Sequence, residues 1–256
     1  MRVKICGIKN ENELETAVNA GADAVGFLVG QRFPSQDFIL PEKAARMTAM
    51  LPPFITPVLV THLTDPREIL EITEKTGITT LQLHGGSTPE QLSFLRKHLG
   101  SAVKFILTLH VGNLPDEINP PPAPFEMLTD AFLLDSFDPA TGKVGGTGKT
   151  HNWQNSAKTV ASVHRPVILA GGLNPDNVAE AIRLVRPFAV DANSALRPFG
   201  LLDGKIASAF VQNALHAFDA PATRPPEKNP NASDENPGTN QEEKNISADP
   251  EKGTPD

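Results

Sequence analysis

Residues 166–195 read PVILAGGLNPDNVAEAIRLVRPFAVDANSA, and this stretch contains the unit from which the fold can be predicted. The apolar run PVILA is followed by two glycines, by a helical pattern and by a second apolar run, FAVD. Asn174 and Pro175 are typical of a helix start. Apolar residues then recur at helical spacing, at Val178, Ile182 and Val185. A buried strand, a helix and a second buried strand are the repeating unit of a parallel α/β fold.

The same alternation extends over residues 1–218. Runs rich in strand-forming residues occur at eight places, which are 3–6, 22–29, 58–63, 79–84, 103–111, 131–135, 166–170 and 188–191. Helical patterns separate most of them, and only residues 112–130 are so rich in proline that we expect a loop. Eight units in about 200–250 residues predict a (β/α)8 TIM barrel. The rival, a doubly wound sheet, normally has a glycine-rich fingerprint after an early strand, where this chain has only Cys6-Gly7.

The composition changes after Phe218. Residues 219–256 contain seven prolines, nine acidic and four basic residues, and Ile246 is their only apolar side chain larger than alanine. Such a segment cannot bury enough surface to offset its loss of conformational entropy. We therefore expect a catalytic barrel over 1–218 and a disordered, acidic, proline-rich tail over 219–256. The tail is expected to be a solvated extension, with contact to an unknown partner as the alternative.

Charge and cysteine content exclude several classes of protein. The net charge of −7 argues against a nucleic-acid surface and against an anchor on an anionic membrane. No apolar run approaches the roughly 18 residues of a membrane span, and MRVKICGIKN has no secretory-signal pattern, so we expect a cytoplasmic protein. The single cysteine excludes an internal disulfide and a multi-cysteine metal cluster within this sequence.

In a barrel of this type the active site forms at the carboxyl ends of the strands. Three groups capable of proton transfer lie there, at Cys6, His84 and Asp135. Asp135 ends an apolar strand, where burying a carboxylate costs free energy unless the group is paired or takes part in the chemistry of a site. Two further loops predict a phosphate site formed by backbone N–H groups, at Gly171-Gly172-Leu173 and at Asn193-Ser194-Ala195.

Two other patterns have weaker interpretations. The run GGTGKT, residues 145–150, is not a nucleotide-binding P-loop, because Lys143 stands where the first glycine is required; we expect a glycine-hinged lid instead. Histidines also end three neighbouring strands, at His62, His84 and His110. Three imidazoles can bind zinc or another divalent metal, although lone histidines are more often hydrogen-bonded or solvated, and no metal is our main expectation.

The segments KICGIKN, GADAVGF, LQLHGG, LLDS, VGGTGKTHNW and PVILAGGLNPDNVAEAI resemble the phosphoribosylanthranilate isomerase family of tryptophan biosynthesis. The resemblance spans residues 2–217. It implies a (β/α)8 barrel and a cofactor-free Amadori rearrangement of an N-glycosyl ribose phosphate, so that the expected partner is a phosphorylated small molecule.

The resemblance also implies roles for individual residues. Cys6 is the general base that removes the C2′ proton, and Asp135 is the general acid that protonates the furanose oxygen. A thiolate base also needs a lowered pKa, which either Lys4 or the dipoles of the phosphate site are expected to supply. The residues expected to bind substrate or its phosphate are Lys4, Arg32, His84, Gly146, Gly171, Gly172, Leu173, Asp191, Ser194 and Ala195.

Departures from the family pattern lie on the side expected to hold anthranilate. The family usually has an arginine where this chain has Asp37, and a carboxylate there would repel an anionic substrate. Arg32 is an alternative cation. His62 and His110 replace the usual asparagine and arginine, and Ala195 replaces a glycine. Two alternatives therefore stay open: a paralogous isomerase acting on another phosphoribosyl-amine or sugar phosphate, and a non-catalytic barrel that binds a phosphate ligand.

Overall fold

The computed structural model describes residues 1–31, 36–111, 121–138, 143–144 and 152–219. The chain divides into two units, Met1–Pro221 and Ala222–Asp256, and the first contains all of the described residues. Several predictions therefore lie outside the described residues. These are Arg32, Gly146 and the rest of the expected lid at 145–150, residues 112–120 of the expected proline-rich loop, and the expected disordered tail beyond Asp219.

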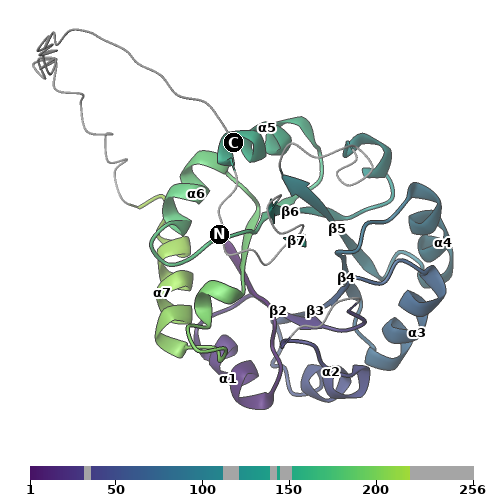
Figure 1. Ribbon diagram of the computed structural model, residues 1–256, viewed down its shortest axis with the longest axis horizontal. Helices are drawn as coiled ribbons and strands as arrows, with labels where there is room; N and C mark the ends of the chain where they lie inside the picture. The colour runs from purple at the N-terminus through teal and green to yellow at the C-terminus, as the bar shows by residue number, and fades with distance from the viewer. Residues whose placement is uncertain (32–35, 112–120, 139–142, 145–151, 220–256) are drawn as a thin grey trace, which may run out of the picture. The chain divides into compact units, whose positions relative to one another are not determined.

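Eight parallel strands form a closed ring (Figure 1). They are β1 (Arg2–Ile5), β2 (Ala24–Leu28), β3 (Thr56–Thr61), β4 (Thr80–Leu83), β5 (Lys104–Val111), β6 (Ala131–Asp138), β8 (Val167–Leu169) and β9 (Ala189–Ala192). β1 pairs with both β2 and β9, and the pairing of β5 with β6 completes the ring. The predicted (β/α)8 barrel is confirmed. A short strand, β7 (Lys143–Val144), pairs antiparallel with β6 outside the ring.

Helices surround the ring of strands (Figure 1). In the described part of the chain they are α1 (Glu11–Asn19), α2 (Pro41–Thr48), α3 (Pro66–Thr76), α4 (Pro89–Leu99), α5 (Trp153–Ser162), α6 (Val178–Val185) and α7 (Gly204–Leu215). Between β5 and β6 the described residues form only a short 3₁₀ turn, η1 (Ala123–Phe125). None of the described helices is long and apolar enough to cross a membrane.

Local capping explains where several helices begin. The side chain of Asn10 accepts a hydrogen bond from the Glu13 N–H, and Thr88 forms a capping box with Gln91. α6 begins later than its sequence suggests. The side chain of Asn174 accepts hydrogen bonds from the N–H groups of Asp176 and Asn177, and these bonds form a turn that precedes the first residue of the helix.

The alternation of side chains along the strands creates two apolar layers. In β1, Val3 and Ile5 belong to the layer between the sheet and the helices. Cys6 belongs to a second cluster, which also contains Val58, Leu133 and Ile168 from other strands of the ring. Because side chains on a strand alternate with a period of two, Lys4 shares the inward face with Cys6. A lysine is thus buried in the interior of the barrel.

Candidate active site

Lys4, Asp191 and Cys6 form a buried polar cluster in the interior of the barrel. Lys4 and Asp191 are direct cross-strand partners in the pairing of β1 with β9. The Lys4 Nζ donates to Asp191 Oδ2 over 2.8 Å, and both side chains are less than 10% exposed. Burial opposes the charge of Lys4, but Asp191 and Cys6 outweigh it and raise the lysine pKa. Lys4 is therefore a cation held next to the thiol.

The thiol of Cys6 has an unusually high pKa. Burial raises it to about 11, and the ammonium of Lys4 and a backbone hydrogen bond from Gly7 oppose this rise. Lys4 therefore acts in the direction expected from the sequence, but the net shift is upward and not downward, because burial of the thiol is the larger effect. Gly26 leaves the space for this thiol, since a Cβ at that position would lie 2.7 Å from Cys6 Sγ.

Asp135 lies beside His84 in a second buried cluster. The Asp135 Oδ1 accepts a hydrogen bond from the Ser136 N–H at 2.7 Å, and Oδ2 lies 3.5 Å from His84 Nε2. His84 Nδ1 lies 3.2 Å from both Gln82 Nε2 and Thr108 Oγ1. Because the Gln82 amide nitrogen is a donor, the proton of a neutral His84 is assigned to Nε2, facing Asp135.

The three histidines predicted at neighbouring strand ends do lie together. The ring centroids of His62 and His84 are 4.9 Å apart, and those of His84 and His110 are 5.5 Å apart, both edge to face. Burial lowers the pKa of His84 well below its usual value and that of His110 to about 4, and neighbouring histidines add to both shifts. Within the described residues, no group of three or more His, Cys, Asp or Glu side chains is arranged to hold a metal ion, so this geometry does not support the zinc hypothesis.

Backbone donors follow β8 and β9, which are neighbours in the ring. Gly171 and Gly172 both have positive φ, and a Cβ on Gly171 would lie 2.7 Å from the Ser136 nitrogen. After β9, Ser194 and Ala195 begin the 3₁₀ turn η2 (Ser194–Leu196) and are exposed. No acceptor for the N–H groups of Gly172, Leu173, Ser194 or Ala195 is present among the described residues. Such clustered, unused N–H groups are suited to an anion.

Residues 3–213 match the family model for N-(5′-phosphoribosyl)anthranilate isomerase. The chain belongs to this isomerase family. It is 45% identical over 219 residues to N-(5′-phosphoribosyl)anthranilate isomerase 2 of Methanosarcina mazei, covering 85% of this chain and 96% of that protein.

Solved structures of the family have the same fold. The phosphoribosylanthranilate isomerase of Thermotoga maritima matches with a TM-score of 0.69 and 34% identity, over 84% of this chain and 98% of that one. A second, with a TM-score of 0.66 and 32% identity, covers 84% and 98% of the two chains and is a complex with reduced 1-(o-carboxyphenylamino)-1-deoxyribulose 5-phosphate.

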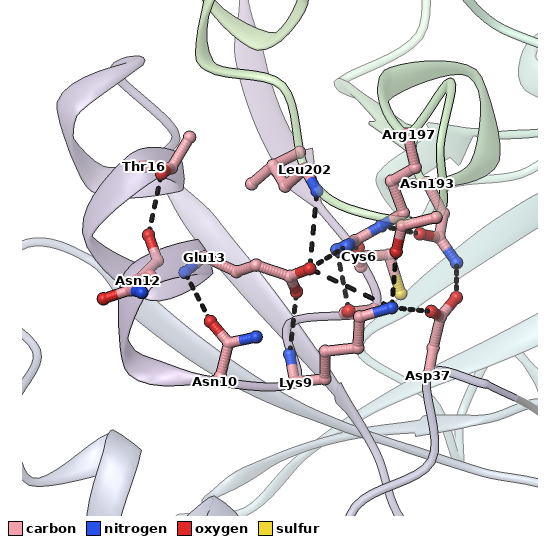
Figure 2. A network of polar contacts seen from close by, with 12 residues as sticks. Cys6, Lys9, Asn10, Asn12, Glu13, Thr16, Asp37, Asn193, Arg197 and Leu202 are labelled. Atoms are coloured by element: carbon pink, nitrogen blue, oxygen red, sulfur yellow. Dashed lines mark hydrogen bonds and ion pairs between the residues drawn. The ribbon is translucent and has the colours of Figure 1, made fainter.

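Within this isomerase fold, Asp37 is not the isolated negative charge that its sequence position suggests. Its Oδ1 lies 3.4 Å from Lys9 Nζ, and its Oδ2 accepts a hydrogen bond from Asn193 Nδ2 at 3.0 Å (Figure 2). The expected repulsion of an anionic substrate is therefore reduced by a neighbouring cation.

The interior of the barrel contains five of the predicted site residues, Lys4, Cys6, His84, Asp135 and Asp191. The predicted phosphate-binding residues lie instead on the loops beyond β8 and β9.

Sequence reasoning missed Arg197 and Glu13. They form an ion pair of 2.7 Å between Arg197 Nη1 and Glu13 Oε1, with each side chain less than 5% exposed. Glu13 stands three positions after the cap residue Asn10, and this local pattern gives no indication of an ion pair. No pattern connects it with an arginine 184 positions away.

Proposed function

We propose that this chain catalyses the cofactor-free Amadori rearrangement of N-(5-phosphoribosyl)anthranilate to 1-(o-carboxyphenylamino)-1-deoxyribulose 5-phosphate in tryptophan biosynthesis. Membership of the isomerase family supports the reaction, and the solved relative with a reduced form of that product supports the ligand. The observation that carries the proposal is the placing of a thiol and a carboxyl group across the barrel. Cys6 follows β1 and Asp135 lies in β6, with β9 and β8 between them in the ring.

Asp135 is assigned the role of general acid. It gives a proton to the furanose ring oxygen, the bond between that oxygen and C1′ breaks, and the nitrogen lone pair forms a C=N bond with C1′. The carboxylate left behind accepts the Nε2–H of His84 and the N–H of Ser136. Because burial keeps His84 neutral, this imidazole donates a hydrogen bond without competing as a source of the proton.

Cys6 is assigned the role of general base. Its thiolate removes the proton from C2′, the C2′–H electron pair forms a C=C bond, and the C=N pair returns to nitrogen. The resulting enol tautomerises to the ketone by moving its hydroxyl proton to C1′. The ammonium of Lys4 stabilises the thiolate, and Asp191 holds that ammonium in place. Since the thiol pKa is about 11, the fraction of Cys6 present as the thiolate should rise as pH increases through the neutral range.

The phosphate is assigned to the N–H groups of Gly172, Leu173, Ser194 and Ala195. Their lack of acceptors within the described residues supports this assignment, and the loops after the seventh and eighth strands of a barrel are a common phosphate site. Asp191 is close to the second loop in sequence, but its contact is with Lys4. We therefore assign it to the thiol cluster and not to the phosphate.

An assay of the purified full-length chain on phosphoribosylanthranilate tests the proposal. We expect product formation that is lost in Cys6→Ala and in Asp135→Asn, both still folded. Complementation of a tryptophan auxotroph lacking this isomerase tests the same function in cells. No turnover by a folded wild-type chain, together with no rescue, would instead support action on a different phosphoribosyl-amine. Phosphate-ligand binding without any turnover would support a non-catalytic barrel.

A further inference from the structure

Arg197 makes contacts with three segments of the barrel mouth at once. Its Nη2 donates to the carbonyl oxygens of Cys6 at 3.1 Å and Gly7 at 2.7 Å. Its Nη1 lies 2.7 Å from Glu13 Oε1 in α1, and its Nε donates to Asn193 Oδ1 at 2.8 Å. Figure 2 shows the guanidinium between these groups. One buried side chain therefore joins the turn after β1, the helix that follows it and the turn after β9.

The two turns are also in direct contact. Gly7 has a φ of +76°, and a Cβ there would lie 2.6 Å from Asn193 Oδ1, the same atom that accepts from Arg197. The Cys6 N–H donates to the carbonyl of Ala192, the last residue of β9, at 2.9 Å. The position of the Cys6 backbone is therefore tied to residues 192–193, immediately before Ser194 and Ala195.

The shape of the guanidinium is essential to this arrangement. Its nitrogens form a rigid planar fork that reaches acceptors in different directions, whereas a lysine has one compact ammonium. Glu13 completes the site, because its Oε2 accepts the Lys9 N–H at 3.1 Å and its Oε1 accepts the Leu202 N–H at 3.4 Å. A cation lacking the fork can pair with Glu13 but cannot also hold two carbonyls and Asn193.

We infer that Arg197 is a positioning residue, which together with Glu13 holds the Cys6 base at a set distance and direction from the phosphate-binding turn at Ser194 and Ala195. It acts through the backbone of Cys6 and Gly7, and its contacts are not with the thiol. The inference rests on the proposed function, since it concerns the base of that reaction. It goes further because it names a residue outside the reacting groups on which the rate of proton removal depends.

Steady-state kinetics of full-length Arg197→Lys test the inference. We expect kcat to fall at least tenfold, with KM changed less than threefold, although the ion pair with Glu13 is kept. The double variant Arg197→Met with Glu13→Gln removes both charges, so neither charge is left buried without its partner. Its kcat should fall at least as far as that of Arg197→Lys.

The matched control is Arg96→Met. Arg96 donates to the carbonyls of Gly100, Val103 and Leu128 and pairs with Asp130 away from this site, so its loss should lower stability and leave kcat unchanged.

Alkylation by iodoacetamide provides a readout that does not need the substrate. Cys6 is the single cysteine of the chain, so incorporation of one label reports on this thiol alone. The pH at the midpoint of the labelling rate should be the same in wild type and in Arg197→Lys, whereas the kcat values of the two proteins should differ. Wild-type kcat in Arg197→Lys and in the double variant, measured where both are folded, would overturn the inference. Turnover that survives in Cys6→Ala would instead overturn the proposed function, so the two failures are distinguishable.

Discussion

Lys4 Nζ and Asp191 Oδ2 lie 2.8 Å apart inside the barrel, on residues that face each other across the pairing of β1 with β9. The charge of this lysine also acts on the thiol of Cys6 and opposes the rise of its pKa. Burying two charges is costly unless they are paired, and here the pair places its cation against the proposed base. The same two residues therefore affect both the stability of the barrel and the ionisation of the thiol.

Lys4→Met should raise the pKa of Cys6 above its value of about 11, because the nearest stabilising charge is lost. Alkylation of Cys6 at pH 8.5 should slow by about tenfold for each pKa unit gained. Asp191→Asn should have the opposite effect, since the Asp191 carboxylate raises the thiol pKa. The measurement is the alkylation rate as a function of pH, and equal slowing in both variants would contradict the assignment.

The Lys4→Met variant should also be less stable, because Asp191 is left buried without its partner. The cost expected for breaking a buried ion pair in this way is about 3–5 kcal/mol in the free energy of unfolding. Adding Asp191→Asn should recover much of that loss, since the unpaired charge is then removed. Urea denaturation of the single and double variants measures both effects, and additive losses would count against a direct pair.

Gly26→Ala should impair the reaction with a smaller effect on the fold. The added Cβ would lie 2.7 Å from Cys6 Sγ and 3.1 Å from Lys4 Cε, so the thiol must move. Overpacking of this kind costs roughly 1–3 kcal/mol of stability. Displacement of a catalytic group by about 1 Å can lower turnover roughly 100-fold. Gly204→Ala is the control, because its added Cβ meets only Thr16 Cγ2 at 3.4 Å, and it should retain wild-type kcat.

Acidification should destabilise the barrel through its buried histidines. The pKa of His110 in the folded chain is about 4, below its ordinary value of 6.5, because burial disfavours the charged ring. The unfolded chain therefore binds a proton first, and the stability linked to His110 is full above pH 6.5 and is lost as pH falls toward 4. The expected loss is about 3 kcal/mol.

Urea denaturation at pH 7 and at pH 4.5 measures this loss. His110→Gln should lose less stability than wild type between the two pH values, because the titrating ring is absent. His216→Gln, which changes an exposed ring in contact with the Gln212 carbonyl, should behave as wild type does. An identical loss in all three chains would show that His110 does not titrate as described.

Much of the framework was predictable from local patterns. Runs of apolar residues predicted all eight strands of the ring, because strands buried on both faces need continuous apolar side chains. Cys6, Asp135 and the glycines at 171 and 172 could be placed at strand ends by the same reasoning, and their combination with the family motifs predicted the reaction. The asparagine and threonine caps of α1 and α4 were also readable, because capping depends on residues close in sequence.

Other features depend on closure of the barrel, which brings the two ends of the sequence together. Lys4 and Asp191 are 187 positions apart, and Arg197 and Glu13 are 184 apart, so no local pattern connects them. In the sequence Asp37 is an isolated negative charge, whereas the fold places Lys9 and Asn193 beside it. Likewise, the sequence by itself determined that a thiol ends the first strand. The tertiary structure alone decided its pKa, because burial and neighbouring charges exist only after the chain has folded.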